Sequence, residues 1–248
     1  MLEAVLFDLD DTLLGNPMDT FLPAYFQALT DYLDHLVPAD RLIRELMKAT
    51  DAMNARGVEH CTNEEAFSSA FYPGIGLDRS RVEPVFERFY AEEFPRLRVL
   101  TKKRPEARHL VEWALQNGLQ VVVATNPLFP RVAVEPRLAW AGVPVKEFDY
   151  ALVTTYENMH ATKSHIAYYR EILARLGREP DECLMVGDSW DMDMAPAMSA
   201  GIYGYWVSEA ASPPRSDAAL AGHGTLRQLW KRVRSQDSLL PTPSARGI

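Results

Sequence analysis

The stretch AVLFDLDDTLL, residues 4–14, decides the fold because an apolar run breaks there into carboxylates. Residues 4–9 are predicted to form a buried strand, yet Asp8, Asp10 and Asp11 follow one another closely at its end. Alternate side chains of a strand share a face, so Asp8 and Asp10 should lie side by side at its carboxyl end. Such a pair is self-repelling, and a hard divalent cation, above all Mg²⁺, would offset its charge.

The same acids could instead end the strand and face water, capping the next helix. This alternative suits Asp11 well. It suits Asp8 poorly, because Asp8 stands between Phe7 and Leu9 inside the apolar run. The end of this strand is therefore a candidate metal site.

The rest of the chain alternates apolar runs with segments of helical spacing. Further strands are predicted at 119–124, 151–155, 183–186 and 202–207, and helices at 105–117, 131–141, 162–176 and 191–200. This alternation predicts an α/β fold, a Rossmann-like three-layer core with a parallel sheet between helices. Ligand sites in such folds form at the carboxyl ends of the strands.

One interval breaks the alternation, from about residue 17 to residue 98. It lacks a convincing strand and predicts amphipathic helices at 20–36, 40–55, 63–70 and 81–93. We interpret it as an inserted helical subdomain. From about residue 235 the chain is rich in Ser, Pro and Arg without periodicity, which predicts a flexible tail.

Composition narrows the functional class. A formal net charge of -8 argues against a nucleic-acid partner and gives no attraction to anionic membranes. Cys61 and Cys183 are far apart and in no metal-binding spacing, so we expect two buried apolar fillers in a reducing compartment. The chain shows neither the layout of a secretory signal nor an apolar stretch of membrane-spanning length, and we expect a cytoplasmic protein.

A second acidic cluster follows another predicted strand, in LMVGDSWDMDMAPAMSAG, residues 184–201. Strand ends of a parallel sheet share an edge, so Asp188 could converge with Asp8 around one cation. The alternative is a helix N-cap, which we favour for Asp191. Asp188, fixed between a glycine and a serine at the strand end, is the stronger metal candidate.

Two further segments carry polar groups suited to phosphate. VVVATN, residues 121–126, ends in Thr125 and Asn126, which could hydrogen-bond phosphate oxygens, although such residues also close strands for local turn reasons. Lys163 stands in HATKSHIAYY at the start of a predicted helix, where the helix dipole disfavours a cation. By itself, an isolated lysine would be expected on the surface.

Together these elements resemble the haloacid dehalogenase superfamily, and within it the magnesium-dependent phosphatases with a helical, C1-type cap. The resemblance lies in DLDDT at 8–12, the strand ending at Thr125, Lys163, and VGDSWDMD at 186–193, in the superfamily's order. It implies a core formed by residues 1–15 and 99–235. The cap would be 16–98, and 236–248 would be the tail.

The resemblance also implies roles in a reaction. Asp8 would be the nucleophile that forms an aspartyl-phosphate, and Asp10 the general acid and then the base that activates water. Thr125 would hydrogen-bond the phosphoryl group, with Asn126 beside it, and Lys163 would neutralise its charge. A carboxylate attacking a phosphate ester meets like-charge repulsion, so cations at the site are physically required.

The implied Mg²⁺ site consists of Asp8, Asp188 and the backbone carbonyl of Asp10. Asp193 would support it, with Asp191 as the alternative. Two positions after the nucleophile, phosphatases of this superfamily have Asp and dehalogenases do not, because halide leaves without a proton. Asp10 therefore favours an alkoxide leaving group.

We accordingly expect a magnesium-dependent enzyme that hydrolyses a small phosphorylated metabolite. A sugar phosphate, a nucleotide and phosphoglycolate all stay open as the substrate, and the chain could act as a monomer or a homodimer. One alternative is a phosphotransferase or mutase that passes the same phosphoryl group to a hydroxyl. A non-catalytic binding protein with this fold is a weaker alternative, because the nucleophile and the metal acids are all present.

Overall fold

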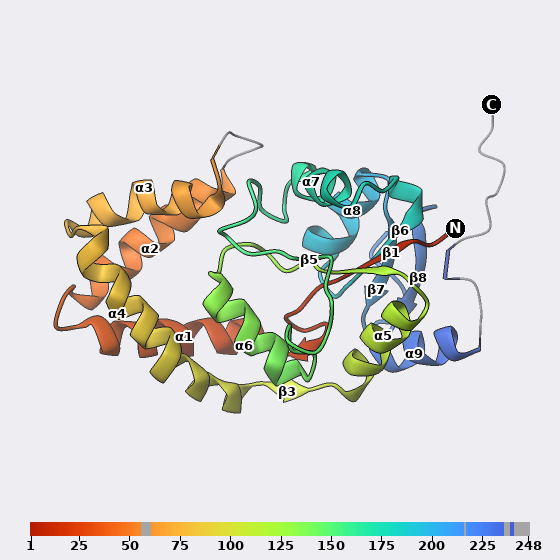
Figure 1. The fold of residues 1–248 in the computed structure, drawn as a ribbon, viewed down its shortest axis with the longest axis horizontal. Helices are drawn as coiled ribbons and strands as arrows, with labels where there is room; N and C mark the ends of the chain where they lie inside the picture. Colours follow the sequence, from red (N-terminus) through yellow and green to blue (C-terminus); the bar gives the residue numbers. More distant parts are fainter. Residues whose placement is uncertain (56–60, 216, 236–238, 241–248) are drawn as a thin grey trace.

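A six-stranded parallel sheet forms the centre of the computed structural model, which describes all residues except 56–60, 216, 236–238 and 241–248 (Figure 1). The strand order is β5-β4-β1-β6-β7-β8, and each neighbouring pair is parallel. The strands are β1 (Ala4–Phe7), β4 (Gln120–Val123), β5 (Leu152–Val153), β6 (Cys183–Gly187), β7 (Tyr203–Val207) and β8 (Leu220–Gly224). The first strand of the chain is therefore central, with β4 and β6 on its two sides.

Helices cover both faces of this sheet, which is why its central strands are apolar throughout. Val5 and Phe7 of β1 belong to one buried cluster, and Ala4 and Leu6 belong to another. The first cluster includes residues of α5 (Pro105–Gln116), α6 (Arg131–Ala141) and α9 (Leu226–Arg234), and the second includes residues of α7 (Ile166–Leu176) and α8 (Ala195–Ser199). The predicted three-layer α/β architecture is confirmed.

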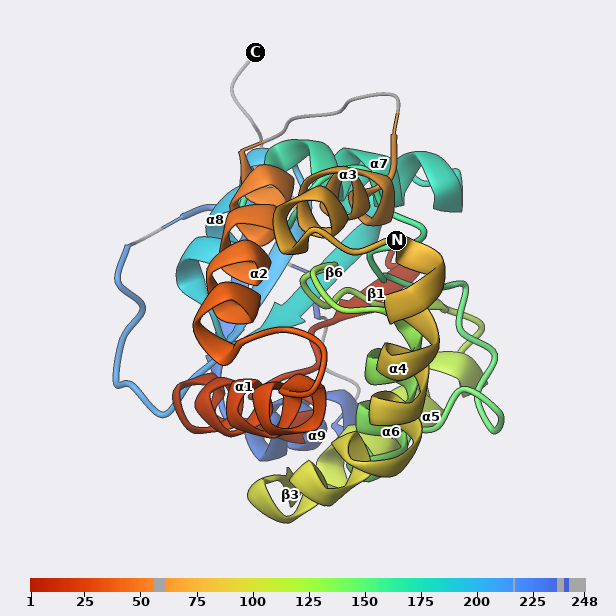
Figure 2. The ribbon, with the colours of Figure 1, turned by 90° about the vertical axis from the view of Figure 1, so that its left-hand side faces the viewer.

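The interval without predicted strands forms a group of helices beside the sheet, here called the helical region. It consists of α1 (Met18–Leu33), α2 (Ala39–Asn54), α3 (Asn63–Ile75) and α4 (Arg79–Glu92), followed by the 3-10 segment Phe94–Leu100. Figure 1 shows β1 running from the N-terminus toward this group, and Figure 2 shows the four helices in front of the sheet. The carboxyl ends of the central strands therefore face the helical region.

A short antiparallel ribbon joins the two segments that connect the helical region to the sheet. β2 (Leu14–Gly15) lies just before α1, and β3 (Lys102–Lys103) lies just before α5. Leu14 pairs with Lys103 and Gly15 with Lys102. The chain thus leaves the sheet and returns to it at one place.

Several predicted boundaries need correction. The first strand ends at Phe7 rather than Leu9, and the helix expected from residue 162 begins at Ile166, so Lys163 precedes it. The helix expected at 191–200 consists of a π-helical turn, Trp190–Met194, followed by α8. Cys183 is buried as expected, whereas Cys61 is only half-buried.

Within the described part of the chain, three strands were not predicted: the two of the ribbon, and β8 at the edge of the sheet. The predicted tail, 236–248, lies outside the described residues except for 239 and 240. Among the helices that the structure describes, none combines the length and the apolar character needed to cross a membrane.

Candidate active site

Three carboxylates gather where β1 and β6 end. Each of Asp8, Asp188 and Asp193 offers an oxygen, and these oxygens all lie within 4.8 Å of one another. The parallel pairing of Phe7 with Val186 brings the two strand ends together, and the Asp8 amide extends the ladder by donating to the Val186 carbonyl at 2.9 Å. The convergence expected from the sequence is present in the structure.

Lys163 lies inside this cluster rather than on the surface. Its side chain is 3% exposed, and Nζ lies 2.5 Å from both Asp8 Oδ1 and Asp193 Oδ1. Burial by itself lowers the pKa of Lys163, but the carboxylates of Asp193 and Asp8 outweigh it, so its pKa is raised. The loop before α7 is fixed in turn because the Lys163 amide donates to Asn126 Oδ1 at 3.2 Å.

The acid cluster carries more negative charge than Lys163 can compensate. Burial raises the pKa of Asp8 well above its ordinary value, with Lys163 opposing and Asp193 and Asp188 adding to the shift. Burial, with Asp193 beside it, raises the pKa of Asp188 to about 6. Excess charge and hard oxygen donors are the conditions that suit Mg²⁺.

Asp193 differs from the other two acids because both of its oxygens are engaged. Oδ1 faces Lys163, and Oδ2 accepts the Ser189 amide at 3.0 Å. Asp188 is freer, since the hydrogen bond to its Oδ1 is a long one of 3.3 Å from the Thr12 hydroxyl. Asp8 and Asp188 are thus the carboxylates best placed to hold a cation, while Asp193 holds the lysine.

Glycine at the end of β6 makes room for this arrangement. A methyl group on Gly187 would stand 2.2 Å from Asp193 Oδ2 and 2.4 Å from its Cγ. Both distances are far shorter than a van der Waals contact, so any side chain here would push the Asp193 carboxylate away from Lys163.

Thr125 and Asn126 follow β4 on the other side of β1. The Thr125 carbonyl accepts the hydroxyls of Thr154 at 2.7 Å and Tyr168 at 2.9 Å, which fixes the backbone while the side chain lines the cavity at the site. Asn126 lines the same cavity. Both residues are therefore where a phosphoryl group near Asp8 could be bound.

Asp10 lies beyond the end of β1, and two donors hold its carboxylate. Asn16 Nδ2 donates to Oδ1 at 2.6 Å, and Arg137 Nη1 donates to Oδ2 at 2.5 Å. Arg137 comes from α6, is completely buried, and also donates through Nε to the Ala133 carbonyl at 3.1 Å.

Neither Asn16 nor Arg137 was identified from the sequence. Arg137 did leave a signal, because it follows Ala133 and Val134 on the buried face of α6. A cation on an otherwise apolar helical face needs a buried partner. Asn16 had no such signal.

Two of the acidic residues considered in the sequence analysis, Asp191 and Asp11, lie apart from the cluster. Asp191 is exposed, so Asp193 is the acid that meets Asp8 and Asp188. Asp11 has a left-handed backbone with φ of 56°, and its Oδ1 accepts a hydrogen bond from the backbone N–H of Asn16 at 3.1 Å. Asp11 therefore closes the loop after β1 instead of capping a helix as expected.

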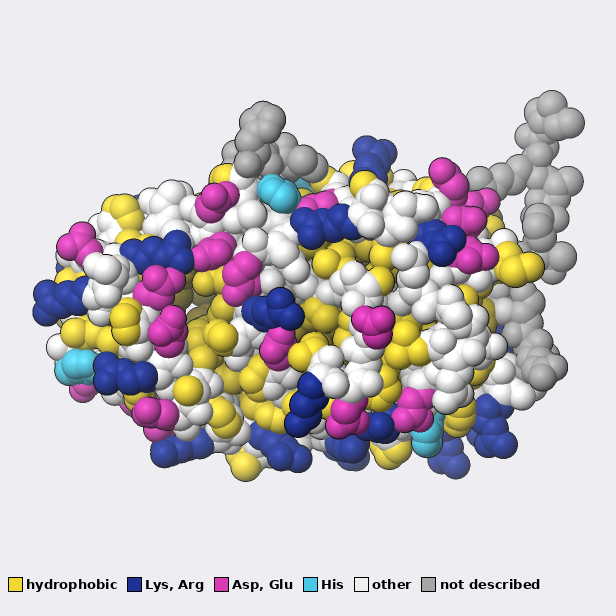
Figure 3. Space-filling view, viewed as in Figure 1, with side chains coloured by type: hydrophobic (Ala, Val, Ile, Leu, Met, Phe, Trp, Pro, Cys, Tyr) yellow, Lys and Arg dark blue, Asp and Glu magenta, His cyan; other side chains and the backbone are white. Residues whose placement is uncertain are grey.

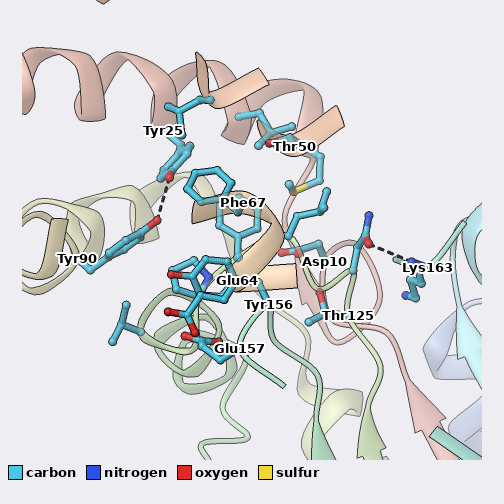
Figure 4. A pocket seen from close by; sticks show the side chains of 18 of the residues that line it. Asp10, Tyr25, Thr50, Glu64, Phe67, Tyr90, Thr125, Tyr156, Glu157 and Lys163 are labelled. Carbon is cyan, nitrogen blue, oxygen red and sulfur yellow. Dashed lines mark hydrogen bonds between the residues drawn. The ribbon is translucent and has the colours of Figure 1, made fainter. Parts of the chain in front are cut away.

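A cavity of about 660 Å³ joins the acid cluster to the helical region. Asp10, Thr125 and Lys163 lie at one end of it, and side chains of α1 to α4 line the other, among them Tyr25 and Phe67 (Figure 4). On the face seen in Figure 3, hydrophobic side chains line a hollow in this part of the molecule, with acidic and basic side chains around it. A substrate could thus place its reacting group among the carboxylates and its remainder among the helices.

Comparison with known proteins gives a consistent result. A family profile described as haloacid dehalogenase-like hydrolase matches residues 2–201. A phosphoserine phosphatase from Thermus thermophilus is 26% identical over 243 residues, covering 88% of this chain and 93% of the relative. A phosphoglycolate phosphatase from Haemophilus influenzae is 25% identical over 205 residues, covering 80% of this chain and 85% of the relative.

Solved structures show the same fold at low identity. A HAD phosphatase from Thermococcus onnurineus superposes with a TM-score of 0.56 at 24% identity, covering 94% of this chain and 98% of that one. A 2-haloacid dehalogenase from Pseudomonas syringae gives a TM-score of 0.64 at 22% identity, covering 95% of this chain and 100% of that one.

Proposed function

The chain belongs to the haloacid dehalogenase-like hydrolases, and we propose that it is a magnesium-dependent phosphatase that works through a phosphorylated Asp8. The observation that carries the proposal is the position of Lys163 Nζ, 2.5 Å from Asp8 Oδ1, inside a cluster of carboxylates at two adjacent strand ends. Names of curated relatives, a phosphoserine phosphatase and a phosphoglycolate phosphatase, support the same reaction class.

In the first step, a carboxylate oxygen of Asp8 attacks phosphorus, and the bond from phosphorus to the ester oxygen breaks. Asp10 gives its proton to that oxygen, so the alcohol leaves neutral. Lys163 lies against Asp8 and offsets the charge that gathers on the phosphoryl oxygens. Thr125 and Asn126, which line the cavity, would orient those oxygens.

In the second step, water replaces Asp8 on phosphorus. Asp10, now a carboxylate, takes a proton from this water, and inorganic phosphate leaves. Asn16 and Arg137 donate hydrogen bonds to the two oxygens of Asp10. One of these contacts therefore has to open in the first step, before Asp10 reaches the oxygen of the leaving alcohol.

Mg²⁺ would be held by Asp8, Asp188 and the Asp10 carbonyl. When bound, the ion supplies positive charge opposite the phosphoryl oxygens and lets the carboxylates stay ionised together. The hard oxygen donors of the cluster support this choice over softer metals.

Residues 16–98 would act as a cap, since the cavity extends from the carboxylates into α1 to α4. A cap over the site would exclude bulk water while the phosphoryl group is transferred. Dehalogenation is the less favoured reaction, because Asp10 serves no purpose for a leaving group that departs without a proton.

The test is hydrolysis of 4-nitrophenyl phosphate with Mg²⁺ and with EDTA. We expect activity only with the metal, and none in Asp8→Asn. Asp191→Asn is the matched control, since Asp191 belongs to the same acidic segment but is exposed and outside the cluster. Full activity of Asp8→Asn would refute the mechanism.

A mutase or phosphotransferase would form the same phosphorylated Asp8. An added alcohol acceptor distinguishes the two functions: a phosphatase releases inorganic phosphate regardless of the acceptor, whereas a transferase makes the new ester in proportion to it. We expect inorganic phosphate.

A further inference from the structure

The half of the cavity inside the helical region is lined by aromatic rings. Phe26 of α1, Phe67 of α3 and Phe86 of α4 approach it from three helices, and Tyr156 approaches from the loop after β5. Phe67 meets Tyr156 edge to face, with ring centroids 6.2 Å apart. Figure 4 shows Phe67 between the Tyr25 and Tyr90 pair and the reaction end of the cavity. Such walls favour an apolar, ring-sized group.

Among the residues that the structure describes, the charged side chains that line this half of the cavity are all acidic. Glu64, Glu83, Glu87 and Glu157 line it. Among the described lining residues of the whole cavity, Lys163 is the one basic side chain, and it lies at the reaction end against Asp8 and Asp193. An anionic group bound among the helices would therefore find no described basic side chain on the wall, and Arg79, which contacts the lining residues Glu64 and Glu83, is already paired with both.

The acids are only partly neutralised. Arg79 Nη2 lies 2.5 Å from Glu64 Oε1 and 2.6 Å from Glu83 Oε1, so one guanidinium serves two carboxylates. Glu157 accepts the backbone amide of Arg131 at the start of α6, at 2.8 and 3.1 Å. Glu87 is exposed on α4 and adds a further negative charge at the cavity.

This charge distribution discriminates between classes of leaving group. A carboxylate or a second phosphate would lose water and face further carboxylates, which is unfavourable without a paired cation. A neutral ring has no charge to desolvate. An ammonium group would interact favourably with both the carboxylates and the faces of the aromatic rings.

The size of the cavity agrees with a bulky leaving group. Its volume of about 660 Å³ lies within the range, roughly 300–1,000 Å³, of sites that bury drug-sized ligands. A two-carbon acid such as glycolate would leave most of the aromatic wall without contact.

From these features we infer that the substrate is a phosphate monoester of an aromatic alcohol whose leaving group is neutral or cationic, and that esters with an anionic leaving group are selected against. The inference rests on the proposed phosphatase activity. It departs from the phosphoglycolate and phosphoserine named for the curated relatives, both of which carry a carboxylate.

The experiment compares three esters of 2-phenylethanol that carry a methyl, an aminomethyl or a carboxymethyl group para to the side chain. The ring is insulated from the ester oxygen, so the three leaving groups have similar intrinsic reactivity. We expect the neutral and cationic esters to exceed the anionic ester in kcat/KM by about tenfold or more. Equal values, or a preference for the anionic ester or for phosphoglycolate, would overturn the inference.

Two variants on α4 test the origin of the discrimination. Glu87→Lys should narrow the gap between the neutral and anionic esters several-fold, and the control Glu92→Lys should leave it unchanged, since Glu92 is exposed on the same helix outside the cavity. Equal effects of the two variants would overturn the assigned role of the cavity acids. If the wild type does not hydrolyse 4-nitrophenyl phosphate in the presence of Mg²⁺, the proposed function itself is refuted.

Discussion

Arg137 Nη1 lies 2.5 Å from Asp10 Oδ2, so a fully buried guanidinium on α6 holds the carboxylate that we propose as acid and base. The same guanidinium donates through Nε to the Ala133 carbonyl and lies 4.6 Å from the centre of the Phe129 ring. Its position is thereby fixed by groups of α6 and the preceding loop. Arg137 is thus a candidate positioning residue for Asp10.

Arg137→Lys should lower kcat for an alkyl phosphate by about 10²-fold, because an ammonium cannot reproduce the planar set of contacts that aims Asp10. The loss should be smaller for 4-nitrophenyl phosphate, whose leaving group hardly needs a proton. Steady-state kinetics on both substrates measure this. Arg131→Lys, at the exposed start of the same helix, is the control, and an equal loss on both substrates would contradict a role through Asp10.

Asp10→Asn should separate the two chemical steps. With 4-nitrophenyl phosphate the first step needs little acid, whereas the second still needs a base, worth about 10²–10⁴-fold. Phosphorylated enzyme should therefore accumulate, visible as a rapid burst of nitrophenol and as one added phosphoryl group on the peptide that contains Asp8. A linear time course with no phosphorylated peptide would argue against Asp10 as the base.

The fold and most of the candidate site could be predicted because their signals are local in the sequence. Apolar runs ending in Asp8, Thr125 and Asp188 mark strands, and parallel strands bring their carboxyl ends to one edge whatever the loops do. The resemblance to a known superfamily supplied the order of the motifs. It also supplied Lys163, which the residues alone left as an expected surface lysine.

What could not be predicted depends on contacts between distant segments. Arg137 and Asp10 are 127 positions apart, and no periodicity links them. The edge strand β8, LAGHG, is short, partly exposed and contains two glycines, so it lacks the pattern of a buried strand. Helix starts shifted for a similar reason: residues 162–165 have helical spacing but form the loop that carries Lys163 into the core.

Lys163→Gln should destabilise the metal-free protein by about 3–5 kcal/mol, because Asp8 and Asp193 would remain buried without their counter-charge. Urea unfolding monitored by circular dichroism gives the free energy of unfolding. Adding Asp193→Asn to the variant should recover part of the loss, and Lys146→Gln on the surface should change little. A single variant as stable as the wild type would mean that the cluster is more hydrated than its burial indicates.

Mg²⁺ binding should weaken as the pH falls through about 6, the value to which burial raises the pKa of Asp188. The pKa of Asp188 in the folded state lies above its pKa in the unfolded state. Between about pH 4 and pH 6 the metal-free folded state therefore holds a proton that the unfolded state has released. Stability from this group is present below that window and is lost as the pH rises through it. A bound cation reverses the effect, because it binds the ionised carboxylate.

Thermal unfolding with and without Mg²⁺ measures this linkage. At a free Mg²⁺ concentration one hundred times Kd, the ion adds about 2.7 kcal/mol to the free energy of unfolding. This corresponds to a rise in Tm of roughly 5–10 °C for a chain of this size. The full rise should be present near pH 8, and roughly half of it should remain near about pH 5, where protonation of Asp188 weakens binding about tenfold. An equal rise at both values would exclude Asp188 as a ligand.

Gly187→Ala should reduce kcat by about 10²-fold, because the new methyl group would displace the Asp193 carboxylate and with it Lys163. Gly204→Ala on the neighbouring strand β7 is the control: its methyl group would meet the flexible side chain of Met194, at 2.9 Å, which can move aside. Circular dichroism confirms that both variants fold. Unchanged activity in Gly187→Ala would show that Asp193 is not needed to place the lysine.

The ribbon of β2 and β3 gives the two proposed reacting carboxylates different mechanical surroundings. Asp10 forms a bridge with Leu14, the first residue of β2, whereas Asp8 is tied to β6 through its amide. A displacement of the helical region would reach Asp10 through this bridge and would work against the hold of Arg137 on its carboxylate, while the nucleophile stays anchored to the sheet. The ribbon therefore couples the helical region to the acid and base of the reaction but not to its nucleophile.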